Sequence, residues 1–189
     1  MGRARTARAV AFSPHSPTST HTGELYLHLQ LGVDCRALLP MAFAQEALIV
    51  SPHHFTLLPN QPAWVLGLFN YRNRILWGLD LPQFLGLEPL DFGQPEHHLV
   101  VMRPEFGGSA SPARTGLGLA VQQVKGVARV PAEQIQPLTK AQAAQNNFRL
   151  ENSYDSCKGL VLEGDEPLWV LDPLAIVQKL NSVDSSANP

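Results

Sequence analysis

The sequence predicts a mainly β protein in which two similar β units follow each other along the chain. Short apolar segments are separated by Gly, Pro, Asn and Asp at turn positions, which is typical of β-hairpins. The segments suited to helices are short. The third observation is an internal repeat: residues 67–85, GLFNYRNRILWGLDLPQFL, align without a gap with residues 159–177, GLVLEGDEPLWVLDPLAIV, at an offset of 92.

The composition agrees with a folded domain and excludes some function classes. The 189 residues are 44% hydrophobic and 16% charged, which is enough for one domain or two subdomains that share a core. The formal net charge of −2 argues against a nucleic-acid-binding protein, and no apolar run has the length for membrane insertion. The two cysteines, Cys35 and Cys157, lack zinc-site or redox spacing, which favours a reduced, cytoplasmic location.

Three regions are expected along the chain. Residues 1–22 contain three arginines and no acidic residue, followed by Ser, Thr, Pro and His, and are interpreted as a disordered tail, with an organellar targeting peptide as the alternative. Residues 23–181 form the folded domain, and residues 182–189 are expected to fray. Two polar segments, 105–115 and 138–155, are predicted loops.

The first half of the domain reads as hairpin, helix, hairpin, helix. Residues 24–40 alternate apolar and polar residues around a Gly-Val-Asp turn, and residues 64–81 form a second hairpin. Between them, MAFAQEAL at 41–48 contains good helix formers and predicts about two helical turns. The segment 82–87 is a short helix with Pro82 in its first turn, and residues 97–103 are a strand.

The second half follows the same plan. Strands are predicted around 117–124 and 126–131, a hairpin at 157–172 and a final helix at 173–180. A weaker similarity relates residues 32–40 to residues 126–131.

The repeat also conserves an aspartate at the end of each hairpin. Asp80 and Asp172 both stand where a strand ends and a short helix begins. A carboxylate there accepts backbone N–H bonds and meets the positive end of the helix. We therefore predict that both aspartates are structural N-caps.

The familiar catalytic motifs are absent from the sequence. It contains no GxSxG, Walker, GxGxxG, HExxH or EF-hand pattern. The histidine pairs 53–54 and 97–98 would point to opposite faces of a strand, so neither pair predicts a metal site, and no cofactor is expected. Two alternatives to a protein that binds other proteins stay open. One is a hydrolase that uses His97 or His98 with an aspartate, and the other is a β-barrel sensor for a small molecule.

The turn Arg72-Asn73-Arg74 is the distinctive surface feature. Asparagine tolerates positive φ, so Asn73 suits a tight hairpin. The two arginines are either a solvated turn or, next to the aromatic Tyr71, an anchor for a protein partner.

At these residues the chain resembles the CheW-like domain family, the adaptors of bacterial chemotaxis-type signalling. The similar pattern is Pro62, WVLGLF, Asn70-Tyr71-Arg72-Asn73, RILWGL and Asp80-Leu81, within a resemblance that extends from 24 to 180. It implies two tandem SH3-like five-stranded β-barrels with short helices around a shared hydrophobic core, interleaved within residues 23–181, and no catalytic activity.

The resemblance also implies partners and a surface that binds them. Such domains link the cytoplasmic tip of a methyl-accepting chemoreceptor, held in the groove between the barrels, to the regulatory domain of a CheA-type histidine kinase. The expected location is the cytoplasm, with recruitment to membrane-associated receptor arrays. By the match, Arg72 takes the place of the family's motif arginine and Glu46 that of an acidic residue at the kinase-facing surface. The partner-binding set is Glu46, Asn70, Tyr71, Arg72, Asn73 and Arg74.

One departure from the family pattern points to a subfamily. Asn73 replaces the usual glycine, and Arg74 and Trp77 complete the variant RNRxxW. This variant is similar to the adaptors of cyanobacterial phototaxis and of type IV pilus (twitching) motility.

Overall fold

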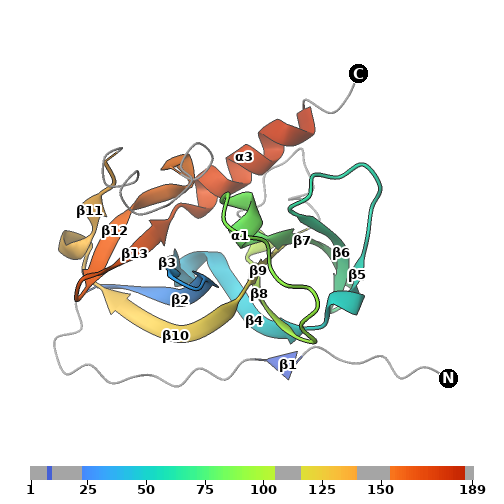
Figure 1. Ribbon diagram of the computed structural model, residues 1–189, viewed down its shortest axis with the longest axis horizontal. Coiled ribbons are helices and arrows are strands. Elements are labelled where there is room, and N and C mark those ends of the chain that lie inside the picture. The colour runs from blue at the N-terminus through green and yellow to red at the C-terminus, as the bar shows by residue number, and fades with distance from the viewer. Residues whose placement is uncertain (1–7, 10–22, 105–115, 140–153, 186–189) are drawn as a thin grey trace.

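The structure is a computed structural model that describes residues 8–9, 23–104, 116–139 and 154–185 (Figure 1). The loop predicted at 105–115, most of the loop predicted at 138–155, most of the predicted N-terminal tail and half of the predicted C-terminal tail lie outside these ranges.

The described residues form two curled sheets, and each contains five strands longer than two residues. We call the first sheet barrel A; its strand order is β1-β4-β8-β9-β7-β6-β5. Its strands are β1 (Arg8–Ala9), β4 (Ala44–Val50), β5 (Phe55–Thr56), β6 (Val65–Tyr71), β7 (Arg74–Asp80), β8 (His97–Met102) and β9 (Leu117–Val121).

The second sheet, barrel B, has the strand order β10-β2-β3-β13-β12-β11. Its strands are β2 (Glu24–Gly32), β3 (Cys35–Pro40), β10 (Gln123–Val130), β11 (Gln136–Pro137), β12 (Cys157–Glu163) and β13 (Glu166–Leu171). The mainly β fold with two five-stranded units is therefore confirmed.

The two barrels are connected differently along the chain. Apart from β1, barrel A is built from consecutive strands, whereas barrel B combines β2 and β3 with the four strands that follow barrel A. A parallel pairing between β3 and β13 joins these distant parts, and β7 and β9 make the matching parallel pair in barrel A. When the two strand orders are matched, β3 of barrel B corresponds to β9 of barrel A. The weak similarity of residues 32–40 to residues 126–131 instead relates β3 to β10, which flank β2 in the same sheet and are not equivalent strands.

The repeat at an offset of 92 is reproduced in backbone detail. The register of β6 on β7 shifts between Val65 and Gly67, and that of β12 on β13 shifts between Cys157 and Gly159. A Cβ on Gly67 would lie 2.2 Å from the carbonyl oxygen of Thr56 in β5, and one on Gly159 would lie 2.4 Å from that of Gln136 in β11. Both glycines are required because a short edge strand crosses each hairpin at its bulge.

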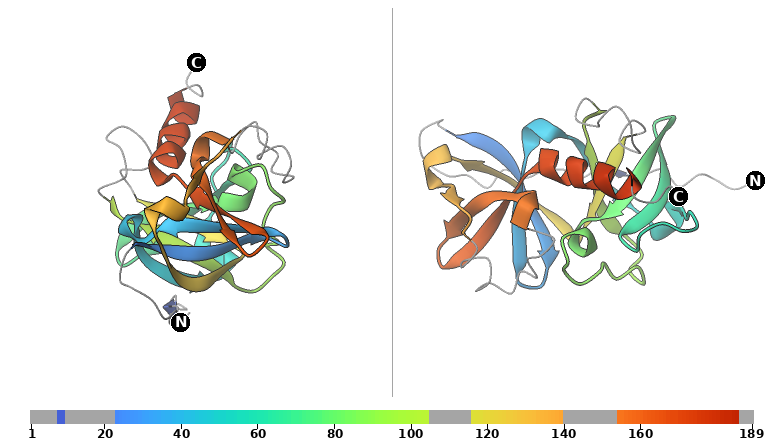
Figure 2. Two further views of the ribbon diagram at one scale, coloured as in Figure 1. Left: turned by 90° about the vertical axis from the view of Figure 1, so that its left-hand side faces the viewer. Right: turned by 90° about the horizontal axis from the view of Figure 1, so that it is seen from above.

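One hydrophobic core joins the barrels and two helices. Its fully buried side chains come from both sheets, from α1 (Leu81–Phe84) and from α3 (Pro173–Ser185), and include Leu29, Leu81, Leu119, Trp169 and Ile176. In the view from above, α3 lies across the junction of the barrels (Figure 2). A smaller apolar cluster fills each barrel separately.

The helix predicted at 41–48 is wrong. The chain makes one 3-10 turn, η1 (Met41–Phe43), and continues as β4. In β4, Ala44, Ala47, Leu48 and Val50 are buried, and the strand pairs along its length with β8. Burial and cross-strand pairing outweigh the helix propensity of alanine, glutamine and glutamate. The described residues also form the 3-10 turns η2 (Pro52–His54), η5 (Ala132–Gln134) and η6 (Tyr154–Ser156).

Both ends of the domain differ in part from expectation. Arg8 and Ala9, within the predicted disordered tail, form β1, which pairs antiparallel with Ile49 and Leu48 at the edge of β4. Helix α3 continues to Ser185, beyond the predicted end of the domain at 181. Within the described ranges, no helix has the length and apolarity needed to cross a membrane.

Candidate functional site

The arginine turn connects β6 and β7 as a tight two-residue hairpin. Tyr71 pairs with Arg74, so Arg72 and Asn73 alone form the turn, and both have positive φ, 47° and 62°. This is the geometry of a type I′ turn. The prediction for Asn73 is confirmed. The left-handed conformation of Arg72 was missed, although a two-residue turn of this type requires positive φ at both positions.

Glu46 lies on β4, which does not pair with β6 or β7, and its side chain reaches this turn. Its Oε2 atom accepts a hydrogen bond from the Tyr71 hydroxyl and lies 2.8 Å from Nη2 of Arg72. The Arg72 guanidinium also lies 5.1 Å from the centre of the Tyr71 ring. Because the Arg72 side chain is 67% exposed, its ion pair stabilises the fold by at most about 1 kcal/mol. The contacts mainly hold Arg72 in one place.

Tyr71 supports this arrangement from below. Its side chain is only 6% exposed and packs in the apolar cluster of barrel A. Burial raises the pKa of Tyr71 to about 12, with further contributions from the hydrogen bond to Glu46 and from its charge. The hydroxyl therefore stays protonated and keeps donating to Glu46. Tyr71 can affect a partner only by positioning its neighbours.

The other predicted partner-binding residues lie on the surface. Asn70, Arg72, Asn73 and Arg74 are exposed, and Glu46 is partly exposed. We refer to these five residues as the hairpin surface. The structure thus brings residues of β4 and of the β6–β7 hairpin together at one end of barrel A.

Asp80 and Asp172 stand at the starts of α1 and α3. Asp80 is fully buried, and its carboxylate accepts from the N–H groups of Gln83 and Leu90, both at 2.9 Å. Burial raises the pKa of Asp80, while these two bonds act in the opposite direction. Asp172 accepts from the N–H groups of Leu174 and Ala175 at 3.1 and 3.3 Å. Both aspartates serve the fold.

The histidines that a hydrolase would use are engaged or enclosed. His97 is 4% exposed and stacks at a tilt on Phe92, with 4.8 Å between ring centres. His98 accepts the N–H of Val124 at its Nδ1 atom. Burial lowers the pKa of both histidines. In the part of the chain that the structure describes, no three His, Cys, Asp or Glu side chains are arranged to hold a metal ion.

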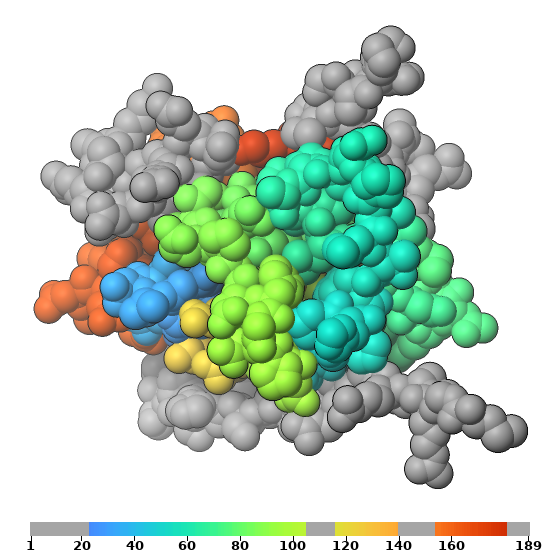
Figure 3. All heavy atoms as spheres, turned by 45° about the vertical axis from the view of Figure 1, so that its right-hand side comes forward, coloured from blue at the N-terminus to red at the C-terminus, as the bar shows by residue number. Residues whose placement is uncertain are grey.

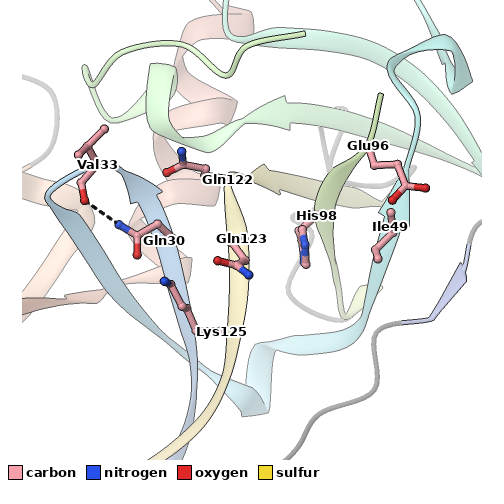
Figure 4. A pocket seen from close by; sticks show the side chains of 8 residues that line it. All are labelled: Gln30, Val33, Ile49, Glu96, His98, Gln122, Gln123 and Lys125. Atoms are coloured by element: carbon pink, nitrogen blue, oxygen red, sulfur yellow. Dashed lines mark hydrogen bonds between the residues drawn. The ribbon is translucent and has the colours of Figure 1, made fainter. Parts of the chain in front are cut away.

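A groove lies between the barrels. Its volume is about 1200 Å³, and its walls come from the β2–β3 hairpin and β13 of barrel B and from the α1–β8 segment of barrel A. Figure 3 shows its mouth between the blue and the light-green atoms. A shallower pocket of about 580 Å³ adjoins it, with Gln30, Gln122, Gln123, Glu96 and Lys125 around the opening (Figure 4). Apart from His97 and His98, these lining residues belong to no catalytic or binding motif in the sequence, because the walls come from segments far apart in the chain.

Comparison with known proteins then decides the family. Residues 34–181 match the model of the CheW-like domain. The chain belongs to the CheW-like domain family.

Individual relatives agree with this membership. A protein of Rhizobium etli described as a probable chemotaxis protein CheW is 33% identical over 82 residues, which cover 43% of this chain and 47% of that protein. The chain thus matches about half the length of that relative. The crystal structure of the scaffolding protein TtCheW from Thermoanaerobacter tengcongensis superposes with a TM-score of 0.59 at 15% identity, over 80% of this chain and 90% of that one, which shows the shared fold. The family model thus confirms the predicted family. CheW-like proteins are, as a family, non-enzymatic scaffolds of chemotaxis-type signalling.

Proposed function

We propose that this CheW-like protein is a non-enzymatic adaptor that couples a methyl-accepting chemoreceptor to a CheA-type histidine kinase. The observation that carries the proposal is the contact of Glu46 with Tyr71 and Arg72. The two charged residues expected at the kinase-facing surface, Glu46 on β4 and Arg72 in the exposed β6–β7 turn, are adjacent in space. Family membership and fold support the same role.

The two partners would use different parts of the molecule. The hairpin surface would face the regulatory domain of the kinase, and the groove between the barrels would hold the receptor tip. The protein would act in the cytoplasm and join membrane-associated receptor arrays. The RNRxxW variant at 72–77 favours a phototaxis or type IV pilus motility pathway within this class.

The geometry of the hairpin suits an anchor in a protein interface. Binding normally loses conformational entropy when a long arginine side chain becomes immobilised in the interface, which weakens the affinity. Here the I′ turn fixes the backbone, and Glu46 and Tyr71 hold the guanidinium before any partner arrives. Arginine on an aromatic side chain is a frequent composition of binding hot spots.

A capture experiment tests the adaptor function. The full chain, the variant Arg72→Glu and the control Lys158→Glu are used as bait in lysate of the source cells, and retained proteins are identified by mass spectrometry. Lys158 is an exposed residue of barrel B, so the control makes the same change of charge far from the hairpin surface along the sequence.

We expect the wild type and the control to retain a CheA-type kinase and a chemoreceptor. Arg72→Glu should lose the kinase while its circular dichroism stays native. Absence of both proteins from the wild-type sample would refute the adaptor function, and equal kinase capture by all three baits would refute the role of the hairpin surface.

The hydrolase alternative loses one of its two histidines in this geometry, because His98 accepts a backbone N–H. The groove leaves the small-molecule sensor as a second candidate. A thermal-shift screen tests it, since a ligand that binds only the folded state raises its apparent stability.

A further inference from the structure

The groove between the barrels is strongly acidic. Its lining includes one guanidinium, that of Arg36, and five carboxylates, on Asp34, Glu88, Asp91, Glu96 and Glu166. These six side chains give a formal charge of −4, although the whole chain has a net charge of only −2. The lining of this groove is therefore more negative than the chain as a whole.

Among the described residues, ion pairs neutralise only a small part of this negative charge. Arg36 is paired with Glu166 and with Glu163, which lies 2.7 Å from its Nη1 atom. Asp34, Glu88 and Glu96 are exposed, and within the described ranges no ion pair engages them. A cleft with low-dielectric walls focuses such a field and attracts cations. It repels phosphates, which excludes nucleic acids as occupants.

The deeper part of the groove has a different character. Leu31, Leu90 and Trp169 line it as buried apolar side chains, while Val33 at the rim is 87% exposed. An occupant that fits both zones needs apolar groups for the deep part and cationic groups for the rim.

His97 supplies an observation independent of the acidic rim. It also lines the groove, its side chain is 4% exposed, and its Nε2 atom has no hydrogen-bond partner among the described residues. Buried polar atoms are normally paired, because an unpaired one costs about 1–3 kcal/mol. A neutral imidazole nitrogen can accept a hydrogen bond from an ammonium or guanidinium group.

We propose that this groove binds a peptide segment of a partner protein that carries lysine or arginine next to apolar side chains. The apolar side chains would pack toward Leu31, Leu90 and Trp169, and the cationic groups would lie along Asp34, Glu88 and Glu96. The proposal rests on the proposed function and specifies it, because the segment would belong to the partner assigned to the groove.

The test uses two labelled peptides and fluorescence anisotropy. One is an amphipathic peptide of lysine and leucine, and the other has glutamate in place of every lysine. They are titrated with three full-length proteins: the wild type, the groove variant Asp34→Lys/Glu88→Lys/Glu96→Lys and the control Glu133→Lys/Asp155→Lys/Asp165→Lys. The control residues are exposed, lie outside the groove and change the net charge by the same amount.

We expect the wild type to bind the lysine peptide about tenfold more tightly than the glutamate peptide. The groove variant should lose about tenfold in affinity for the lysine peptide, while the control changes by less than about threefold. Equal weakening of the groove variant and the control would mean general charge attraction and would overturn the proposal. Absence of a preference in the wild type would overturn it as well.

Two further outcomes separate this proposal from neighbouring ones. If Arg3→Gln/Arg5→Gln/Arg8→Gln binds the lysine peptide more tightly than the wild type, the basic N-terminal segment is the occupant, and the proposal is overturned. If the lysine peptide shows no preference but the wild type captures a receptor and a kinase, the adaptor function stands and only the cationic chemistry fails. Selective peptide binding without capture would leave the groove proposal standing without the adaptor function.

Discussion

The two aspartates at equivalent positions of the repeat allow a sharp test of how burial sets the value of a helix cap. Asp80 and Asp172 both accept N–H bonds from the first turn of a helix. Only Asp80 is fully buried, and only it has a second bond to a distant residue, Leu90. Replacement of each by alanine removes the same carboxylate from two different environments.

The expected losses differ about threefold. Removal of a helix cap costs about 1 kcal/mol, which is the whole effect expected for Asp172→Ala, because water can reach the freed N–H groups. Asp80→Ala loses a cap of the same kind and also leaves the buried N–H of Leu90 without an acceptor, which adds about 2 kcal/mol. We expect Asp80→Ala to lower the free energy of unfolding by about 3 kcal/mol.

Equilibrium urea unfolding near neutral pH, followed by circular dichroism, measures both values. Comparable m-values in the three proteins would show that the same unfolding reaction is compared. Equal destabilisation by the two substitutions would refute the reasoning, because it would mean that the buried bond to Leu90 adds nothing.

Three further predictions follow from the backbone and the buried histidines. Arg72→Gly should change the free energy of unfolding by less than about 1 kcal/mol, because glycine adopts positive φ without strain and this gain offsets the lost ion pair. The same variant should abolish kinase capture. A large loss of stability in urea would contradict this expectation. Gly67→Ala and Gly159→Ala should each lower the free energy of unfolding in urea by more than about 3 kcal/mol, because the new Cβ overlaps a backbone oxygen. Gly164→Ala has open space around it and should lower this free energy by about 1 kcal/mol. Similar values at all three sites would be inconsistent with the bulge geometry. Burial lowers the pKa of His97 below 6.5, so the unfolded state binds the proton more readily. The free energy of unfolding should therefore fall as the pH drops through about 6.5 toward the folded-state pKa. This pH dependence should be smaller in His97→Phe, and an unchanged dependence would show that His97 does not contribute.

Much of the hairpin and cap structure was predictable because its causes are local. The positive φ of Asn73 follows from a two-residue turn, and the capping by Asp80 follows from a strand that ends next to a proline-containing helix. The same local reasoning failed at 41–48, where alanine, glutamine and glutamate favour a helix. There the decision comes from β8, a strand some fifty residues further along the chain, through a ladder that opposes Ala44 to Met102 and Val50 to His97.

By itself, the sequence determined the mainly β class, the repeated hairpins and the caps, and its resemblance to the CheW-like family was correct. Turn chemistry, periodicity and capping act over a few residues, so they can be read without the fold. Only the tertiary structure decided that β4 is a strand, that Tyr71 is buried beneath Arg72 and that five carboxylates line one groove. Each of these depends on side chains distant in sequence meeting in space, because burial and the electric field of a cleft arise only when the chain has packed.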